Sequence, residues 1–316
     1  MITALLLGVL GCAAPTAPPA PLEPVVLRPD AVPAARAAVS DAGLDELRWG
    51  YTPYLGIDGE TEGWRPVFEH LGERLGVPIR LVPLAGYAQA EQAIVDRRVD
   101  AAIMSPYGYV QARKLAPGLR VFASHVARGY PTYGVYVIAL EHSPVQSLTD
   151  VKGRPFGYVD KRSTSGWLFP AARMLSEGID PLDDVQASFL GSHGAVFDAV
   201  ATGQVDAGAI YDHALTTQRL SHPQGHLVRV VAKAPRIPFD AYVLREGLDP
   251  VVGRALGLLL SELSTQTTEG RAILRGTPSV NGFFAVDDAH YDILRDVEHT
   301  VEARLAPDAA GARNPR

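Results

Sequence analysis

The chain has 316 residues, of which 47% are hydrophobic and 20% are charged, and its formal net charge is −6. This length and composition predict a globular protein large enough for two domains. The acidic balance argues against nucleic acid as a partner, because phosphate-backbone binding relies on an excess of Lys and Arg. It does not exclude a small anion, which a few well-placed donors can hold.

The chain begins with a short apolar run that ends at its single cysteine, Cys12. The sequence Val9-Leu10-Gly11-Cys12 resembles the end of a bacterial lipoprotein signal, although no Lys or Arg precedes the apolar run. We therefore predict that residues 1–12 are a lipoprotein signal peptide and that Cys12 is the lipidated residue. The alternative is a buried or frayed segment with an incidental cysteine. One cysteine also excludes an internal disulfide and a cysteine-rich metal site.

Both ends of the remaining chain have the composition of extended segments. Residues 13–44 are rich in Ala and Pro, which predicts a tether that holds a folded body away from a membrane. Residues 306–316 are predicted to be a disordered tail.

Strand and helix patterns alternate between these ends, as in a parallel sheet covered by helices. In the first series, the predicted strands are residues 47–51, 79–82, 101–104 and 121–124, and the predicted helices are residues 64–75, 87–98 and 110–115. Trp49 and Trp64 are expected in the core, and His125 at the surface or in a cap.

A second series lies between two long β-type runs, residues 133–140 and 237–245. Its predicted strands are residues 155–159, 187–190 and 207–211, and its predicted helices are residues 167–177 and 195–202. A helix at 249–265 and a segment at 291–305 complete the chain. The two bracketing runs predict an α/β fold of two lobes joined by two crossing strands. Lobe 1 comprises residues 45–137 and 240–305, and lobe 2, inserted into it, comprises residues 138–239.

The most informative motif is Ser163-Thr164-Ser165-Gly166, which follows a strand and opens a helix. Helix starts carry unpaired amide hydrogens and a partial positive charge. Three consecutive hydroxyls add donors at the same point, which predicts a cradle for a tetrahedral anion without a fixed positive charge. The alternative is an ordinary helix cap, but a cap needs only one hydroxyl.

Other polar residues follow strands of the second series. His193 lies at the start of a helix, and Asp212 and His213 follow the strand at 207–211. Ligands of open α/β sheets bind at the carboxyl ends of strands, so all three are candidate ligand-binding residues. Each of them also fits a role in capping or packing a helix.

Together these motifs resemble the phosphate/phosphite/phosphonate-binding (PhnD-type) family of ABC-transporter substrate-binding proteins. The resemblance runs from about Leu47 to about Arg245 and continues more weakly to about Leu305. It implies the type II periplasmic-binding-protein fold. The motifs that carry it are Ser163-Thr-Ser-Gly-x-Leu-x-Pro170, Gly191-Ser-His193 and Gly203-Gln-Val-Asp-Ala-Gly208.

The resemblance also implies roles for individual positions. Residues 163–165 match the phosphonate-cradling triplet, and His193 matches a histidine that donates to the same group. Tyr87 matches an aromatic hydroxyl from the first lobe, and Asp240 an acidic residue that lines the cleft.

Two positions depart from the family pattern. Members often carry an aromatic residue followed by Gly where this chain has Met104-Ser105-Pro106-Tyr107, so Ser105 and Tyr107 become candidates for the donor and the aromatic group. Aminoethylphosphonate-binding members carry a glutamate where this chain has His213, next to Asp212. This difference argues against an amine-bearing ligand.

Asp240 restricts the protonation state of the ligand. A carboxylate beside an anion costs free energy unless the ligand offers a proton or a cation. The ligand is therefore expected to carry a P–OH group or an ammonium group. The alternative is a structural carboxylate that pairs with a neighbour such as Arg236.

The resemblance predicts a periplasmic or extracytoplasmic lipoprotein that captures a phosphonate, phosphite or phosphate and delivers it to an ABC permease. We expect a monomer whose lobes close on the ligand, without a cofactor or a metal. The chain has no Gly-x-Ser-x-Gly elbow, P-loop or His-Glu-x-x-His motif, so an enzyme is not expected. The alternative function is a sensing subunit that presents the bound oxyanion to a membrane histidine kinase.

Overall fold

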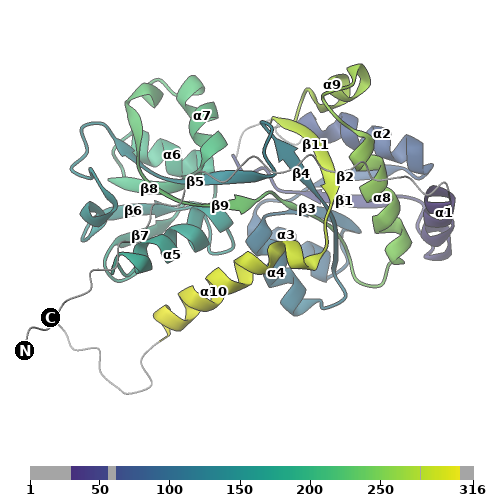
Figure 1. Cartoon of the computed structure of the whole chain (residues 1–316), viewed down its shortest axis with the longest axis horizontal. Coiled ribbons are helices and arrows are strands. Elements are labelled where there is room, and N and C mark those ends of the chain that lie inside the picture. The colour runs from purple at the N-terminus through teal and green to yellow at the C-terminus, as the bar shows by residue number, and fades with distance from the viewer. Residues whose placement is uncertain (1–29, 56–61, 278, 307–316) are drawn as a thin grey trace, which may run out of the picture.

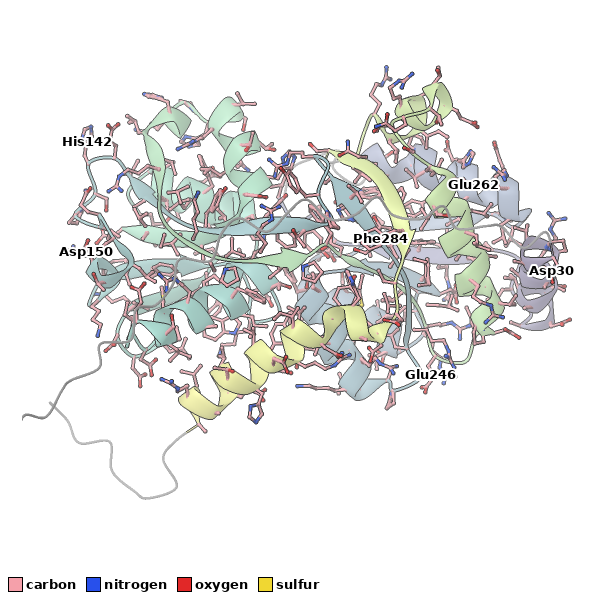
Figure 2. All side chains as sticks on the ribbon, in the orientation of Figure 1. Asp30, His142, Asp150, Glu246, Glu262 and Phe284 are labelled. Atoms are coloured by element: carbon pink, nitrogen blue, oxygen red, sulfur yellow. The ribbon has the colours of Figure 1, made fainter. Side chains whose placement is uncertain are left out.

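The computed structural model describes residues 30–55, 62–277 and 279–306. Two β-sheets lie end to end, each covered by helices, and together they form two lobes (Figure 1). Figure 2 labels two exposed residues at the outer ends of these lobes: Asp30 on lobe 1 and His142 on lobe 2.

Lobe 1 contains a six-stranded mixed sheet in the order β11-β4-β10-β3-β1-β2. Strands β1, β2 and β3 are parallel, and β10 runs antiparallel between β3 and β4. The strands are β1 (Leu47–Tyr51), β2 (Ile79–Pro83), β3 (Ala101–Met104), β4 (Arg120–Ala127), β10 (Ala241–Leu244) and β11 (Val280–Ala285).

Helices cover both faces of this sheet because the buried side chains of its strands alternate between two apolar clusters. Ala101 and Ile103 join the cluster formed with α2 and α8, whereas Ala102 and Met104 join the cluster formed with α3 and α4. The helices of lobe 1 are α1 (Ala31–Asp41), α2 (Arg65–Leu75), α3 (Tyr87–Val95), α4 (Pro106–Leu115), α8 (Pro250–Glu262) and α9 (Thr268–Leu274).

Lobe 2 contains a five-stranded sheet in the order β7-β6-β8-β5-β9. Its strands are β5 (Thr132–Leu140), β6 (Pro155–Tyr158), β7 (Gln186–Phe189), β8 (Ala207–Tyr211) and β9 (Val228–Pro238). Its helices are α5 (Phe169–Ser176), α6 (His193–Ala201) and α7 (Asp212–Ser221). Phe156 and Tyr158 of β6 pack with α5, while Ile210 of β8 packs with α6 and α7.

The chain crosses between the lobes twice, at residues 128–131 and at residues 239–240. The second sheet begins at Thr132, whereas the sequence placed the lobe boundary at residue 138. The apolar pattern of residues 133–140 predicts a strand correctly but does not reveal to which sheet it belongs. The predicted run at 237–245 is two strands, because the chain leaves the sheet of lobe 2 after Pro238 and joins the sheet of lobe 1 at Ala241.

Helix α10 (Asp292–Leu305) lies along both lobes (Figure 1). Its buried Leu294 and Val301 belong to the same apolar cluster as Val110 of α4 and Ala171 of α5. Its Glu298 is buried and accepts hydrogen bonds from the Tyr107 hydroxyl (3.0 Å) and from Lys114 Nζ (2.7 Å). Residues 292–305, which the sequence assigned to lobe 1, therefore contact lobe 2 as well.

The prediction of a tether through residue 44 is wrong for its last part, because residues 31–41 form helix α1. Ala35 and Val39 are fully buried, and Arg36 Nε donates to the carbonyl oxygen of Leu75 (2.9 Å). Alanine favours helices, and an i, i+4 pair of apolar residues gives a short helix one face to bury. Pro33 is tolerated because it lies in the first turn. Residues 13–29, the signal segment 1–12 and residues 307–316 lie outside the described residues.

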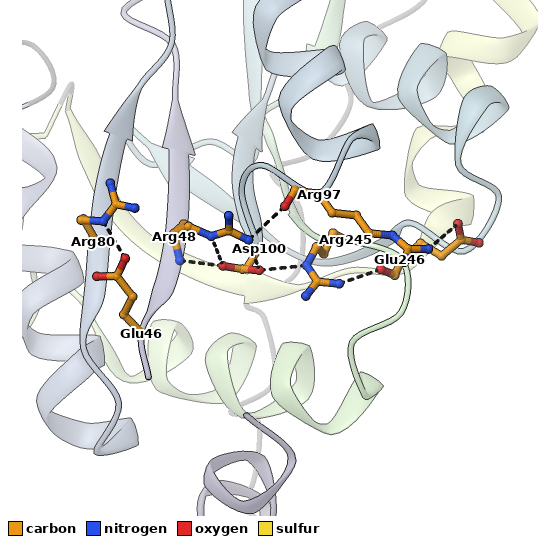
Figure 3. A network of polar contacts seen from close by, with 7 residues as sticks. All are labelled: Glu46, Arg48, Arg80, Arg97, Asp100, Arg245 and Glu246. Atoms are coloured by element: carbon orange, nitrogen blue, oxygen red, sulfur yellow. Dashed lines mark hydrogen bonds and ion pairs between the residues drawn. The ribbon is translucent and has the colours of Figure 1, made fainter. Parts of the chain in front are cut away.

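A buried ion network ties together the amino ends of β1 and β3 and the carboxyl end of the antiparallel β10 in lobe 1 (Figure 3). Asp100 is fully buried and accepts from Arg48 Nε and Arg245 Nε, each at 2.8 Å. Burial alone would raise the pKa of Asp100, but the hydrogen bonds from both arginines outweigh burial and hold that pKa below its usual value. Asp100 precedes β3, so this network lies at the end of the sheet opposite Ser105.

Candidate ligand-binding site

A cavity between the lobes brings together most of the residues predicted from the sequence. Its wall contains Tyr87, Ser105, Ser163, Thr164, Ser165, His193, His213 and Asp240. The cavity offers about 70 Å³ to the centre of a water molecule. Because one bound water needs about 10–15 Å³ by this measure, the space suits a ligand of a few heavy atoms.

The hydroxyl triplet opens the helix that follows β6. Ser163 has an extended backbone (φ −77°, ψ 128°), and residues 164–168 form a π-helical turn that continues into α5. Gly166 allows this turn to sit against the end of β6, since a Cβ atom there would lie 2.4 Å from Val159 Cβ. Ser163, Thr164 and Ser165 are at most 2% exposed, so these hydroxyls face the cavity and not bulk solvent.

Two of the three hydroxyls already accept a hydrogen bond. Ser163 Oγ accepts from the Gly166 amide (3.0 Å), and Thr164 Oγ1 accepts from the Tyr107 amide of lobe 1 (2.9 Å). An accepting hydroxyl keeps its own hydrogen for donation. The amides of Thr164 and Ser165 lie in the first helical turn, where no acceptor exists within the helix. The triplet is therefore a concentrated set of donors without a net charge.

Ser105, which we expected to donate to the ligand, lines the cavity, but its hydroxyl makes other hydrogen bonds. Its hydroxyl donates to the carbonyl oxygen of Arg162 in lobe 2 (3.1 Å) and accepts from the Gly108 amide (3.1 Å). Its hydrogen is therefore engaged across the cleft, where it helps to hold the lobes together.

The structure does not bring Tyr107 and Asp212 to the cavity wall. The Tyr107 hydroxyl donates to Glu298 of α10 instead. Asp212 Oδ1 accepts from Arg128 Nη2 (2.8 Å), and its Oδ2 accepts from the Gly134 amide (2.9 Å). Both residues position elements around the cavity.

Three nitrogen atoms of the wall residues are buried without a hydrogen-bond partner among the described residues: His193 Nδ1, His213 Nδ1 and Trp64 Nε1. Burial lowers the pKa of His193 to about 3, so its imidazole is neutral at physiological pH. Burial and the charge of Arg128 lower the pKa of His213. Buried polar atoms normally have partners, so these nitrogens are candidates for contact with a ligand or a bound water.

Aromatic side chains that the sequence analysis did not select complete the wall. Tyr54 lies 5.3 Å from Tyr87 between ring centroids, and Tyr133 stacks on Phe239 at 5.1 Å. Trp64, which belongs to the core as expected, and His125, which we expected at the surface or in a cap, both line the cavity. For Tyr54 and Phe239, position along the chain was the available sign of a role in the cavity wall. Tyr54 follows the carboxyl end of β1, and Phe239 lies in a crossover.

Asp240 lies in the second crossover, next to these aromatic hydroxyls. Burial raises the pKa of Tyr54 and of Tyr133 well above the usual range, and the negative charge of Asp240 raises both further. Both hydroxyls therefore stay protonated and act as donors. Arg236 donates from Nε to Thr132 Oγ1 (3.0 Å), and its Nη1 lies 3.8 Å from Asp212 Oδ2.

Within residues 30–55, 62–277 and 279–306, no helix has the length and apolar character needed to cross a bilayer. Over the same residues, no three His, Cys, Asp or Glu side chains are grouped so that they could hold a metal ion.

Two α/β lobes, two crossover segments and a cavity between them define a two-lobed binding protein. The chain belongs to the family described as "ABC transporter, phosphonate, periplasmic substrate-binding protein", which matches residues 49–291. The family confirms the expected class: an extracytoplasmic substrate-binding protein of a transporter, not an enzyme.

Individual relatives agree with this assignment. The phosphate-import protein PhnD of Mycolicibacterium smegmatis is 26% identical over 255 residues, which cover 73% of this chain and 78% of that protein. The binding protein of an ABC phosphonate transporter from Pseudomonas aeruginosa has a TM-score of 0.75 at 24% identity, covering 84% of this chain and 90% of that one. PhnD1 of Prochlorococcus marinus, solved with methylphosphonate, has a TM-score of 0.73 at 19% identity, covering 82% and 98%. These likenesses confirm the type II periplasmic-binding fold and give no support to the sensor alternative.

Proposed function

We propose that this protein captures a small phosphorus oxyanion carrying a P–OH group and delivers it to an ABC permease. Phosphate, phosphite and methylphosphonate are the candidate ligands. The observation that carries the proposal is the hydroxyl triplet at residues 163–165. Ser163 and Thr164 accept from the amides of Gly166 and Tyr107, and the hydroxyls of Thr164 and Ser165 meet the Tyr133 hydroxyl on the cavity wall. A tetrahedral anion would draw these hydroxyls and the first-turn amides as donors.

Cavity size supports a small ligand. The available space holds only a few heavy atoms, and rings such as Tyr54, Tyr133 and Phe239 enclose it. A hydrogen or a methyl group on phosphorus fits such walls, whereas a long polar chain would leave its polar atoms without partners.

Asp240 supports a protonated ligand. Its carboxylate lines the same cavity as the triplet, so a ligand without a proton would place two negative charges close together. A P–OH group instead donates a hydrogen bond to the carboxylate. Sulfate has no such proton near neutral pH and should therefore bind poorly.

The cavity is a poor site for an aminoalkyl substituent. The guanidinium of Arg128 lines the wall near His213, and cations repel an ammonium group. The nearby carboxylate of Asp212 is already paired with Arg128 and the Gly134 amide. We therefore expect aminoethylphosphonate to bind less tightly than methylphosphonate.

Calorimetric titration of a chain that begins at residue 30 tests this function. Phosphite, phosphate, methylphosphonate, aminoethylphosphonate and sulfate form the panel. At least one of the first three should bind at least tenfold more tightly than aminoethylphosphonate and sulfate. Failure of the first three, or tighter binding of sulfate, would overturn the proposal.

We further propose a monomer anchored to the membrane through a lipid on Cys12. The apolar run and Gly11-Cys12 support this anchor. Cys12→Ser should move the protein from the membrane fraction to the soluble extracytoplasmic fraction, and mass spectrometry should show no lipid on the variant. An unmodified Cys12 in the native protein would contradict the anchor.

A further inference from the structure

An ion pair joins the two lobes directly beside the hydroxyl triplet. Arg162 of lobe 2 directs its Nε to Glu91 Oε2 (2.7 Å) and its Nη2 to Glu91 Oε1 (3.2 Å). Glu91 lies on α3 of lobe 1 and is 7% exposed, so the contact is bidentate and largely shielded from water on the carboxylate side. Such charge-assisted pairs are stronger and more directional than neutral hydrogen bonds.

Glu91 of this pair lies on the same face of α3 as Tyr87, a residue of the cavity wall. Tyr87 and Glu91 are one turn apart on α3 and therefore project from the same side. The Tyr87 hydroxyl lies 3.4 Å from His193 Nε2 in lobe 2, and Glu91 reaches Arg162 in the same lobe. One face of α3 thus contacts lobe 2 at two points, one in the cavity wall and one behind the triplet.

The contact depends on closure of the lobes. Glu91 and Arg162 belong to different lobes, and neither lies in a crossover segment, so rotation of the lobes apart separates them. The pair between Arg128 and Asp212 differs, since Arg128 lies in the first crossover, where the chain joins the two lobes.

We infer that the Arg162–Glu91 pair is a latch that sets the population of the closed form and thereby the affinity for every ligand. Arg162 is a positioning residue, because its side chain does not line the cavity. A ligand that binds only the closed form has an apparent Kd equal to its intrinsic Kd divided by the closed fraction. Loss of the latch should therefore weaken all ligands by the same factor and leave their ratios unchanged.

Titrations with phosphite, phosphate and methylphosphonate test this inference. Arg162→Gln and Glu91→Gln should each weaken every ligand that binds by about tenfold, mostly through faster dissociation. The charge-swapped double variant, Arg162→Glu with Glu91→Arg, should recover part of the loss. Arg173→Gln is the matched control: Arg173 pairs with Glu177 within lobe 2, and its side chain is 37% exposed, as is that of Arg162. A change in the ligand ratios, or unchanged affinity, would overturn the latch.

A second measurement needs no ligand. Fluorophores on Leu115→Cys in lobe 1 and Leu220→Cys in lobe 2, both exposed positions, report the distance between the lobes by single-molecule energy transfer once Cys12 is replaced by Ser. Arg162→Gln should lower the closed fraction of the ligand-free protein about tenfold, whereas Arg173→Gln should not. An equal closed fraction in all variants would overturn the latch even if no phosphorus oxyanion binds, so this result is separable from failure of the proposed function.

Discussion

The backbone amide of Tyr107 in lobe 1 donates a 2.9 Å hydrogen bond to Thr164 Oγ1 in lobe 2. This bond connects the start of α4 to the hydroxyl triplet across the cleft. The Thr164 hydroxyl hydrogen stays on the cavity side, where the Tyr133 hydroxyl and an anion compete for it. One side chain thus contributes to closure of the lobes and to the proposed capture of the anion.

Replacement of Thr164 by Val should separate the effect of the hydroxyl's hydrogen bonds from the effect of side-chain packing. Val keeps the shape but removes both the acceptor for Tyr107 and the donor for the ligand, so we expect a loss of about 2–3 kcal/mol in binding free energy. Thr164→Ser keeps the hydroxyl and should bind within about threefold of the wild type. Calorimetry with methylphosphonate measures both. Equal affinity of the Val variant and the wild type would count against the triplet.

Asp240→Asn should relax the selection for a protonated ligand. Without the carboxylate, we expect the affinity for sulfate to rise about tenfold or more, because charge repulsion is removed. The preference for methylphosphonate over sulfate should narrow accordingly. Asp198→Asn, an exposed change on α6, is the control and should leave both affinities unaltered. A sulfate affinity that stays low in Asp240→Asn would show that the carboxylate does not set this preference.

Two buried histidines should make stability depend on pH. Burial lowers the pKa of His125 and of His193 from 6.5 to about 3. Between these values the unfolded chain binds protons that the folded protein does not, so the free energy of unfolding falls as the pH falls. The slope is about 1.4 kcal/mol per pH unit for each histidine.

Urea unfolding at pH 7, 6 and 5 measures this dependence. His125→Phe should reduce the slope by about 1.4 kcal/mol per pH unit, the contribution of one histidine. Replacement of the exposed His142 by Asn should leave the slope unchanged. The same slope in the wild type and His125→Phe would show that His125 is not held neutral by burial.

Asp100→Asn should destabilise lobe 1 without affecting the ligand. The substitution leaves Arg48 and Arg245 without their buried counter-ion, which costs about 3–5 kcal/mol of unfolding free energy. The pKa of Asp100 is lowered in the folded protein, so the stabilisation that its ionised form provides is present above pH 3.8, the usual pKa. This stabilisation is lost as the pH falls through the lowered pKa. Asp96→Asn is the control at an exposed pair. Ligand affinity should be measured under conditions in which the variant is fully folded. A large loss of affinity there would contradict the placement of this network away from the site.

The sequence was most informative where function depends on local structure. The triplet at 163–165 opens a helix, and a helix start presents the same donors whatever packs around it. The alternating strand and helix patterns likewise predict the two lobes and the insertion of one in the other. Both features follow from spacing along the chain.

Tertiary packing decided the features that the sequence analysis placed wrongly. His125, expected at the surface or in a cap, lies buried in the cavity wall, and nothing local in the sequence marks such a position. Trp64 belongs to the core as predicted and also lines the cavity. Helix α1 was assigned to a tether because its composition is rich in Ala and Pro, yet the burial of Ala35 and Val39 stabilises it. The engagement of Ser105 with Arg162 depends on contact between the lobes, which spacing does not reveal.

The most direct test of the central claim is a crystal structure of the protein grown with methylphosphonate. We predict a tetrahedral phosphorus group in the interlobe cavity, with its oxygens within hydrogen-bond distance of the hydroxyls of Ser163, Thr164 and Ser165 and a P–OH directed at Asp240. Density for the ligand elsewhere, or a cavity filled only by protein and water at saturating ligand, would contradict the account.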